Sequence, residues 1–270
     1  MKVTLINFAN EKYKQAQKYN TLTAKLFGRI DEVIECSPDM IDEEFIEKNK
    51  FIFSYKRGFG LWLWKPYFIR KYLNEIKEND YLFYSDSGAI FCRSIKPLIK
   101  SMGQEDIWIS DIPLIEEEWT RPNVFTHFNC NEDYVCKTPQ VQAAFIILKK
   151  NENTVKFVDE WLENCMNPEL LCPIEEGFTA GKCISHREDQ SILSVLCKIH
   201  GIKTHKDATQ YGRYPELYKA EGRTYVVPNH VDKYKTVIVH HRMSKVNITL
   251  AMKLYVKTVF TNAWKKEIKS

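Results

Sequence analysis

Hydrophobic and polar positions follow two patterns in the first third of the chain. Short apolar runs, typical of buried strands, alternate with segments whose apolar residues are interspersed among Lys and Gln, as in surface helices. The patterns predict, in chain order, a strand at 3–8, a helix at 11–26, a strand at 32–36, a helix at 67–76 and a strand at 80–84. Gly28 closes the first helix and Pro66 opens the second. This order predicts a parallel sheet with helices on its faces.

The remaining sequence continues the same mixture and contains no internal repeat, low-complexity tract or Gly/Ser/Pro-rich linker. Further strands are predicted at 107–110, 143–148 and 236–239, and further helices at 153–165, 189–200 and 249–264. We therefore expect one α/β domain over residues 1–270, with a mostly parallel central sheet. A basic amphipathic helix is expected within 249–270.

Composition places the chain among ordinary globular proteins. Its 270 residues are 44% hydrophobic and 27% charged, which excludes disordered and collagen-like classes. The net charge of +4 is too small for a dedicated nucleic-acid binder. Positive charge is concentrated near the carboxyl terminus: from residue 231 onward the sequence has nine Lys and Arg but only two Asp and Glu. Nucleic acid is therefore not an expected partner.

The compartment is predicted from the start of the chain and from its cysteines. The apolar run at 3–8 is too short for the core of a secretory signal, and no apolar run is long enough to span a bilayer. The eight cysteines contain no Cys-x-x-Cys pair, so we expect reduced, partly buried thiols. The expected location is the cytoplasm.

The first candidate site residue is Asp86, in the segment Tyr84-Ser85-Asp86-Ser87-Gly88. A buried strand of a parallel sheet has no structural need for a carboxylate at its carboxyl end, whereas open α/β sheets bind ligands at that end. The alternative is a turn aspartate that caps the following segment.

Several segments together resemble the bacterial capsule- and lipopolysaccharide-type glycosyltransferases of the GT-A fold. The resemblance covers roughly residues 1–245 and rests on the order and spacing of RGFG at 57–60, WLWKPY at 62–67, YSDSG at 84–88, WTR at 119–121, QAAF at 142–145 and HREDQS at 186–191. It implies a nucleotide-diphosphate-sugar donor, most simply a UDP-sugar, and a glycan or lipid-linked glycan acceptor.

The resemblance also implies that Asp86 meets the donor diphosphate through a divalent cation, Mn²⁺ or Mg²⁺. The usual motif is Asp-x-Asp, but its second acid is Gly88 here. One carboxylate is a weak anchor for such a cation. Related transferases often supply a histidine near the carboxyl terminus, so His240 or His241 resembles a second ligand. Neighbours on a strand point to opposite faces, and either ring has a structural hydrogen-bonding role as its alternative.

Further donor contacts are expected at Lys65, Ser87 and Arg242. Lys65 lies at a helix start, where backbone N–H groups and a cation attract phosphate; the alternative is a surface lysine whose stem covers Trp64. Ser87 belongs to the same motif as Asp86. Arg242 follows the histidine pair and either reaches the diphosphate or faces solvent.

Nucleotide contacts are expected after the first strand. Ala9 and Tyr13 occupy the position where GT-A proteins usually receive the base. Asn10 either hydrogen-bonds a uracil edge or caps the helix, and the cap alone explains it.

Catalytic contacts are expected at Asp189 and Gln190, which open a helix. In related transferases such a pair faces the sugar or the acceptor, where a carboxylate deprotonates a hydroxyl or stabilises oxocarbenium-like charge. The alternative for Asp189 is a first-turn acid that stabilises the helix. His186 is expected to support this pair as a polar contact.

The predicted function is hexose transfer from a nucleotide diphosphate sugar to a hydroxyl of a surface glycan. One alternative is a non-catalytic module that binds nucleotide sugar or glycan, which the missing second acid favours. Another is a sugar nucleotidyltransferase, although the Gly-rich basic loop usual in that class is absent after the first strand. The basic carboxyl-terminal helix, with apolar Ile248, Met252, Tyr255, Val259 and Phe260, predicts peripheral contact with the inner face of the cell membrane or simple packing on the domain.

Overall fold

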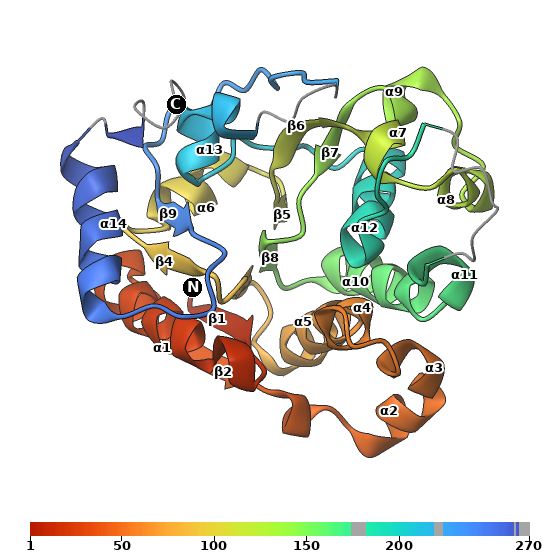
Figure 1. Cartoon of the computed structure of the whole chain (residues 1–270), viewed down its shortest axis with the longest axis horizontal. Helices are drawn as coiled ribbons and strands as arrows, with labels where there is room; N and C mark the ends of the chain where they lie inside the picture. Colours follow the sequence, from red (N-terminus) through yellow and green to blue (C-terminus); the bar gives the residue numbers. More distant parts are fainter. Residues whose placement is uncertain (174–181, 219–223, 262, 265–270) are drawn as a thin grey trace.

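The computed structural model describes residues 1–173, 182–218, 224–261 and 263–264. Its central sheet contains β1 (Val3–Phe8), β2 (Glu32–Cys36), β3 (Tyr81–Ser85), β5 (Ile107–Trp108) and β8 (Phe145–Lys149), in the spatial order β2-β1-β3-β8-β5 (Figure 1). β1 pairs in parallel with β2 and β3. The mostly parallel sheet is therefore confirmed, with the exception of β8, which is antiparallel to both its neighbours.

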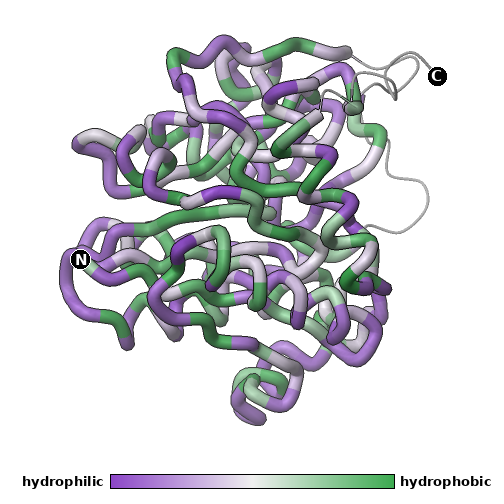
Figure 2. Tube along the Cα trace, turned by 90° about the vertical axis from the view of Figure 1, so that its left-hand side faces the viewer, coloured by the Kyte–Doolittle hydropathy of each residue, from purple (hydrophilic) through white to green (hydrophobic). Residues whose placement is uncertain are grey.

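The sheet is buried on both faces, because alternate residues of each strand enter different cores. Ile6 and Tyr84 pack with α5 (Trp64–Glu75), α10 (Glu152–Cys165) and α12 (Glu188–Ile199). Leu5 and Phe83 pack on the opposite side, under α6 (Lys96–Met102) and the π turn η2 (Ala24–Gly28). Continuous apolar runs are typical of such doubly covered strands. Hydrophobic segments accordingly run through the middle of the molecule (Figure 2).

Two small antiparallel pairs complete the strands. β4 (Ala89–Phe91) pairs with β9 (Ile238–His240), and β6 (Asp111–Ile115) pairs with β7 (Pro139–Val141). The strand predicted at 236–239 is therefore present at 238–240 but lies outside the central sheet. No strand was predicted at β4, β6 or β7.

The predicted helix at 11–26 is confirmed as a continuous segment made of η1 (Glu11–Tyr13), α1 (Lys14–Thr23) and η2. The other helices are η3 (Pro38–Met40), α2 (Glu43–Lys48), α3 (Lys50–Phe53), α4 (Gly58–Leu61), α7 (Glu116–Trp119), α8 (Pro122–His127), α9 (Asp133–Cys136), α11 (Pro168–Leu171), α13 (Gln210–Arg213), η4 (Pro215–Tyr218) and α14 (Ile248–Phe260). No helix of the described chain combines the length and apolar character that a bilayer crossing requires.

α14 differs in part from its prediction. The helix buries Ala251, Leu254 and Thr258, and Tyr255 and Val259 pack beside them. The exposed apolar residues are instead Ile248, Met252, Val256 and Phe260, which recur at every fourth position. We call these four residues the α14 stripe. The predicted basic residues Lys265, Lys266 and Lys269 lie outside the described residues.

Candidate active site

Two adjoining cavities lie at the carboxyl end of β3. The first, the strand-end cavity, has a volume of about 520 Å³ and includes Phe8, Ala9, Asn10, Tyr13, Trp64 and Ser87 in its lining. The second, the helix-side cavity, has a volume of about 360 Å³ and includes Lys65, Trp119, Gln142, Asp189 and Gln190. Arg57, Trp62, Asp86, His240 and Arg242 line both. The two cavities therefore meet at Asp86.

Asp86 follows β3 directly and is held from both sides. Its backbone N–H donates to the carbonyl of Ala144 at 2.9 Å, and the Tyr84 hydroxyl donates to its Oδ1 at 2.6 Å. Tyr84 and Asp86 point the same way because residues two apart on a strand share a face. About a third of the carboxylate side chain remains exposed to the cavities. The side chain is therefore fixed but accessible.

Gly88 stands where the Asp-x-Asp motif would have its second acid. The segment directly after β9 packs closely against this glycine. The backbone N–H groups of His241 and Arg242 both donate to the Gly88 carbonyl at 2.9 Å. A Cβ at position 88 would lie 3.1 Å from Cα of Arg242, closer than most real Cβ contacts. The glycine thus lets the end of β9 dock onto the end of β3.

This docking places His240, and not His241, beside Asp86. His240 Nε2 lies 3.9 Å from Asp86 Oδ2, and Gln210 fixes the histidine backbone through two hydrogen bonds. Burial lowers the pKa of His240 well below its usual value, so the imidazole is neutral and able to act as a ligand. His241 lines neither cavity, and its Nδ1 accepts from the backbone of Met243.

The donor set at this position fits a divalent cation only in part. A carboxylate and a neutral imidazole are suitable ligands for Mn²⁺, and less so for Mg²⁺. Within the described residues, no group of three or more His, Cys, Asp or Glu side chains is arranged to hold a metal. A cation bound by Asp86 and His240 would therefore need further oxygens from a phosphate-bearing ligand and from water.

Lys65 lies between the acids of the two cavities. It is 4% exposed, and its Nζ lies 3.0 Å from Asp189 Oδ2 and 3.7 Å from Asp86 Oδ1. Burial opposes its charge, but the two carboxylates raise the pKa of Lys65 above its usual value. The alternative of a solvated surface lysine is therefore wrong. α5 begins at Trp64, so Lys65 is its second residue.

Asp189 is buried in the first turn of α12. Burial raises the pKa of Asp189 to about 7, against the opposing effect of Lys65. The indole of Trp161 donates to its backbone carbonyl at 3.0 Å, which fixes this turn. Gln190 follows, with Nε2 donating to Gln140 at 2.7 Å and Oε1 accepting from the backbone of Ala143 at 3.2 Å. Asp189, Lys65 and Asp86 thus form a continuous charged row across the two cavities.

The segment after β1 lines the other end of the strand-end cavity. Ala9 and Tyr13 lie there as expected. Asn10 also lines it, but its side chain makes no capping hydrogen bond, so the expectation that a helix cap alone explains Asn10 is wrong. Its Oδ1 is buried and has no hydrogen-bond partner among the described residues. A ligand with an N–H group would complete it.

The remaining predicted polar residues have different surroundings. Arg242 is exposed, and its guanidinium lies 5.2 Å from the Tyr211 ring centre and 5.7 Å from that of Tyr218. The Ser87 hydroxyl donates to the Phe8 carbonyl at 2.6 Å and so ties β3 to β1. His186 lines neither cavity, and its Nε2 lies 2.9 Å from the backbone carbonyl of Leu170.

Arg57 was not predicted as a site residue. Its guanidinium pairs with Glu188 at 2.7 Å and lies 5.2 Å from the Trp62 ring centre. Phe59 and Trp62 adopt positive φ, which turns the chain sharply into the cavity wall. The two glycines on either side of Phe59 were the available sequence signal for this turn.

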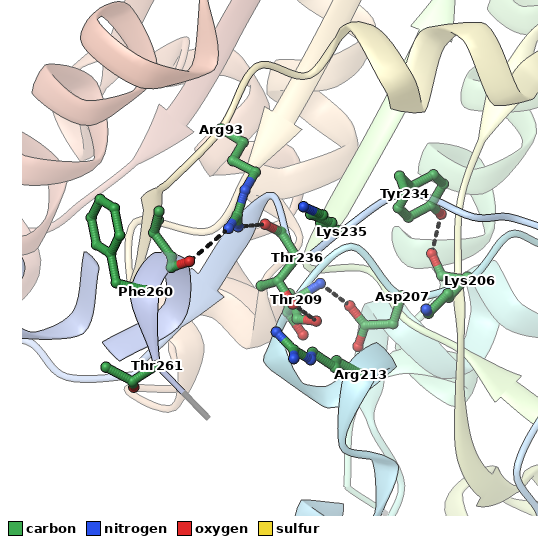
Figure 3. A pocket seen from close by; sticks show the side chains of 11 residues that line it. Arg93, Lys206, Asp207, Thr209, Arg213, Tyr234, Lys235, Thr236, Phe260 and Thr261 are labelled. Atoms are coloured by element: carbon green, nitrogen blue, oxygen red, sulfur yellow. Dashed lines mark hydrogen bonds between the residues drawn. The ribbon is translucent and has the colours of Figure 1, made fainter. Parts of the chain in front are cut away.

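A third cavity lies apart from the strand-end residues. It has a volume of about 410 Å³ and lies between the start of β9 and the end of α14 (Figure 3). Arg93, Lys206, Arg213 and Lys235 belong to its lining, and Phe260 of the α14 stripe lies at one side (Figure 3). None of the predicted site residues lines it.

Comparison with known proteins places the fold. No protein-family model and no curated protein sequence matches the chain. Among solved structures, the galactosyltransferase LgtC, crystallised with donor and acceptor sugar analogues, matches over 98% of this chain and 99% of its own, with 13% identity and a TM-score of 0.50. Mouse xyloside xylosyltransferase 1 matches over 93% of this chain and 99% of its own, with 9% identity and a TM-score of 0.49. The glycosyltransferase GlyE of Streptococcus pneumoniae matches over 100% of this chain and 62% of its own, with 10% identity and a TM-score of 0.46.

At such identities the similarity to LgtC concerns the fold alone. The mixed α/β architecture, with its mostly parallel central sheet, is the GT-A fold found in glycosyltransferases. The fold class expected from the sequence is confirmed.

Proposed function

We propose that this protein is a glycosyltransferase that moves a hexose from a nucleotide diphosphate sugar to a hydroxyl of a surface glycan. The observation that carries the proposal is the charged row of Asp189, Lys65 and Asp86, with His240 beside Asp86, where two cavities meet at the carboxyl end of β3. A diphosphate, a cation and a sugar are the groups that such a row suits.

The nucleotide belongs in the strand-end cavity. A volume of about 520 Å³ suits a nucleotide-sized ligand. Tyr13 offers an aromatic ring for the base, and the Asn10 amide can meet the N–H and carbonyl of a uracil edge. This hydrogen-bonding pattern supports a UDP-sugar as donor.

The diphosphate belongs where the cavities meet. Lys65 and Arg242 supply positive charge, and Asp86 with His240 would hold a divalent cation between protein and phosphate oxygens. When bound, that cation would stabilise the negative charge of the leaving nucleoside diphosphate. Lys65 would also stabilise this negative charge, because two acids keep its ammonium group protonated although it is buried.

The sugar and acceptor belong in the helix-side cavity. Asp189 and Gln190 lie there together with the ring of Trp119, against which a sugar face can pack. A carboxyl group whose pKa is about 7 exchanges a proton readily near neutral pH, which suits a base for the acceptor hydroxyl. The Gln190 amide is the neutral polar neighbour of the reacting carbon.

A non-catalytic binding module is the second candidate. Gly88 favours it, because the second acid of the Asp-x-Asp motif is missing and a Cβ at this position would crowd Arg242. The two candidates share a donor site and differ in turnover.

Donor binding can be tested by thermal unfolding with a panel of nucleotide sugars and free nucleotides, with and without Mn²⁺. A ligand at a hundred times its Kd stabilises a protein by about 2.7 kcal/mol, which shifts the melting temperature measurably. We expect a shift with a UDP-sugar that is reduced in Asn10→Ala and unchanged in Asn167→Ala, a surface cap distant from the cavities. If none of the nucleotide sugars shifts the melting temperature, the proposal is contradicted.

We further propose that the α14 stripe contacts an anionic membrane, where a lipid-linked acceptor would lie. Four exposed apolar side chains on one helix edge suit an interfacial helix, and Phe260 is 72% exposed. The cations of the third cavity line the same cavity as Phe260. Each cation near an anionic leaflet contributes about 1 kcal/mol.

Sedimentation with liposomes tests the membrane contact. We expect more protein to bind phosphatidylglycerol vesicles than neutral ones, and less of the variant Met252→Ser/Phe260→Ser to bind. Phe51→Ser is the matched control, because Phe51 is 59% exposed on α3. Equal recovery on both vesicle types, or equal binding of both variants, would end this proposal.

A further inference from the structure

A chain of polar side chains runs behind the helix-side cavity from α7 through β7 to α12. Glu116 and Gln140 are fully buried, and Gln190 lies at the cavity end of the chain. Buried polar groups must be paired, so the order of donors and acceptors along such a chain is determined by its ends.

The first end is Glu116, which can only accept hydrogen bonds. Lys198 Nζ lies 2.7 Å from its Oε2, where the Ser194 hydroxyl also donates. The Thr120 hydroxyl donates to Oε1 at 2.5 Å. A carboxylate that is paired with an ammonium group requires a donor from every neighbour.

Gln140 is therefore oriented with its nitrogen towards Glu116. Its Nε2 lies 3.1 Å from Glu116 Oε1, 3.2 Å from the Thr120 hydroxyl and 3.4 Å from the Trp119 carbonyl. The Thr120 proton is already directed at Glu116, so all three neighbours present lone pairs. The reversed amide would place an oxygen against three oxygens. The Gln140 carbonyl consequently faces Gln190.

At the other end of this row of polar side chains, the hydrogen bonds of Gln190 require the same orientation of donors and acceptors. Gln190 donates from Nε2 to the Gln140 oxygen at 2.7 Å, and its Oε1 accepts from the backbone N–H of Ala143 at 3.2 Å. A backbone N–H can only donate, so a reversed Gln190 would meet a donor with a donor and an acceptor with an acceptor. Both ends fix one orientation and leave one N–H and one oxygen lone pair of Gln190 for a ligand.

We infer that Glu116 and Gln140 are positioning residues that fix the orientation of the Gln190 amide towards the transferred sugar. This inference rests on the proposed function. A carbonyl oxygen held in place stabilises positive charge that develops at the sugar carbon, whereas an amide free to rotate would also present N–H groups there. The network contacts no substrate itself, so its effect passes through Gln190.

The test is Gln140→Met, which preserves volume and removes the link. We expect kcat to fall by about tenfold to a hundredfold, the range for a misplaced catalytic contact, with little change in the KM for donor. Gln17→Met is the matched control, since Gln17 is also fully buried and donates to Asn7 and the Cys36 carbonyl, away from Gln190. The control should lower the melting temperature without lowering kcat.

A double-mutant cycle separates positioning from general damage. If Gln140 acts through Gln190, then Gln140→Met/Gln190→Met has the same kcat as Gln190→Met alone. Effects on kcat that multiply in the double variant, or an unchanged kcat in Gln140→Met, would overturn the inference.

A second readout needs no activity. Side-chain amide NMR of the folded protein should show one Gln190 N–H protected from exchange, identified by its absence in Gln190→Met, and Gln140→Met should abolish that protection. Protection that persists in Gln140→Met would overturn the inference. A wild-type protein with this protection but without turnover of any nucleotide sugar would instead contradict the proposed function.

Discussion

Lys65 carries a positive charge in a position where a lone ammonium group would be costly. The carboxylates of Asp189 and Asp86 compensate it, and they keep the pKa of Lys65 raised despite burial. The same burial raises the pKa of Asp189 to about 7. With both acids ionised, this row carries a net negative charge, so a diphosphate would bind there only with added positive charge from Arg242 and from a divalent cation at Asp86 and His240.

Asp189→Asn is predicted to lower turnover by about two orders of magnitude, the loss typical of a positioned acid or base. The change keeps the shape but removes the carboxylate that Lys65 faces at 3.0 Å. Steady-state rates should show the loss in kcat, with a smaller change in donor affinity. Asp159→Asn is the control, because Asp159 forms an exposed ion pair with Arg70 and neither residue lines either cavity.

If both Asp189→Asn and the control keep full activity, Asp189 is only a first-turn acid of α12. If donor hydrolysis without acceptor falls as much as transfer, Asp189 acts on the donor sugar and not on the acceptor hydroxyl.

Several residues could be placed near the site from the sequence because they end or begin predicted elements. Asp86 follows a buried run, and Asp189 opens a helix. Glu116 could not be found in this way, because Glu116 to Glu118 form a charge run that usually lies in solvent. The structure buries Glu116 since Ser194 and Lys198, about eighty residues away, supply its partners. Such long-range pairing leaves no local pattern.

Strands were predicted where burial on both faces leaves a continuous apolar run, as in β1 and β3. The direction of β8 was not predictable, because an apolar run is the same for a parallel and an antiparallel strand. β9 was predicted from its apolar run, but β4 has only three residues, too few for a periodic signal. Their pairing nevertheless brings His240 to Asp86, so a decisive part of the site depended on an element that sequence patterns do not mark.

Restoration of the missing acid by Gly88→Asp is predicted to fail. The new Cβ would press on Arg242 and displace the end of β9, a case of overpacking that costs about 1–3 kcal/mol. Calorimetry should therefore show a lower melting temperature and no tighter Mn²⁺ binding. Gly88→Ala should be destabilised to a similar extent, because the Cβ is the shared cause. Tighter metal binding at an unchanged melting temperature would contradict this account of the glycine.

At the scale of the whole molecule, the site is assembled from segments that lie far apart in the sequence. Residues within 8–13, 57–65, 86–88, 187–190 and 240–242 contribute to the lining of the two cavities. The central sheet makes this possible, because β1 and β3 are parallel and adjacent, so that their carboxyl ends meet at one edge. The physical patterns of the sequence predicted that edge, whereas the convergence of the later segments on it followed only from the resemblance of their motifs to a known family.

The most direct test of the central claim is the release of nucleoside diphosphate from a panel of nucleotide sugars by the wild-type protein and by Asp86→Ala. We predict release by the wild type, with a UDP-sugar preferred, and a loss of at least about a hundredfold in Asp86→Ala because the leaving diphosphate loses its metal and charge support. The melting temperature of the variant should stay within a few degrees, since the Asp86 side chain lines a cavity and Lys65 keeps Asp189 as a partner. An equal rate in Asp86→Ala, or a folded wild type that releases nucleoside diphosphate from none of these sugars, would contradict the account.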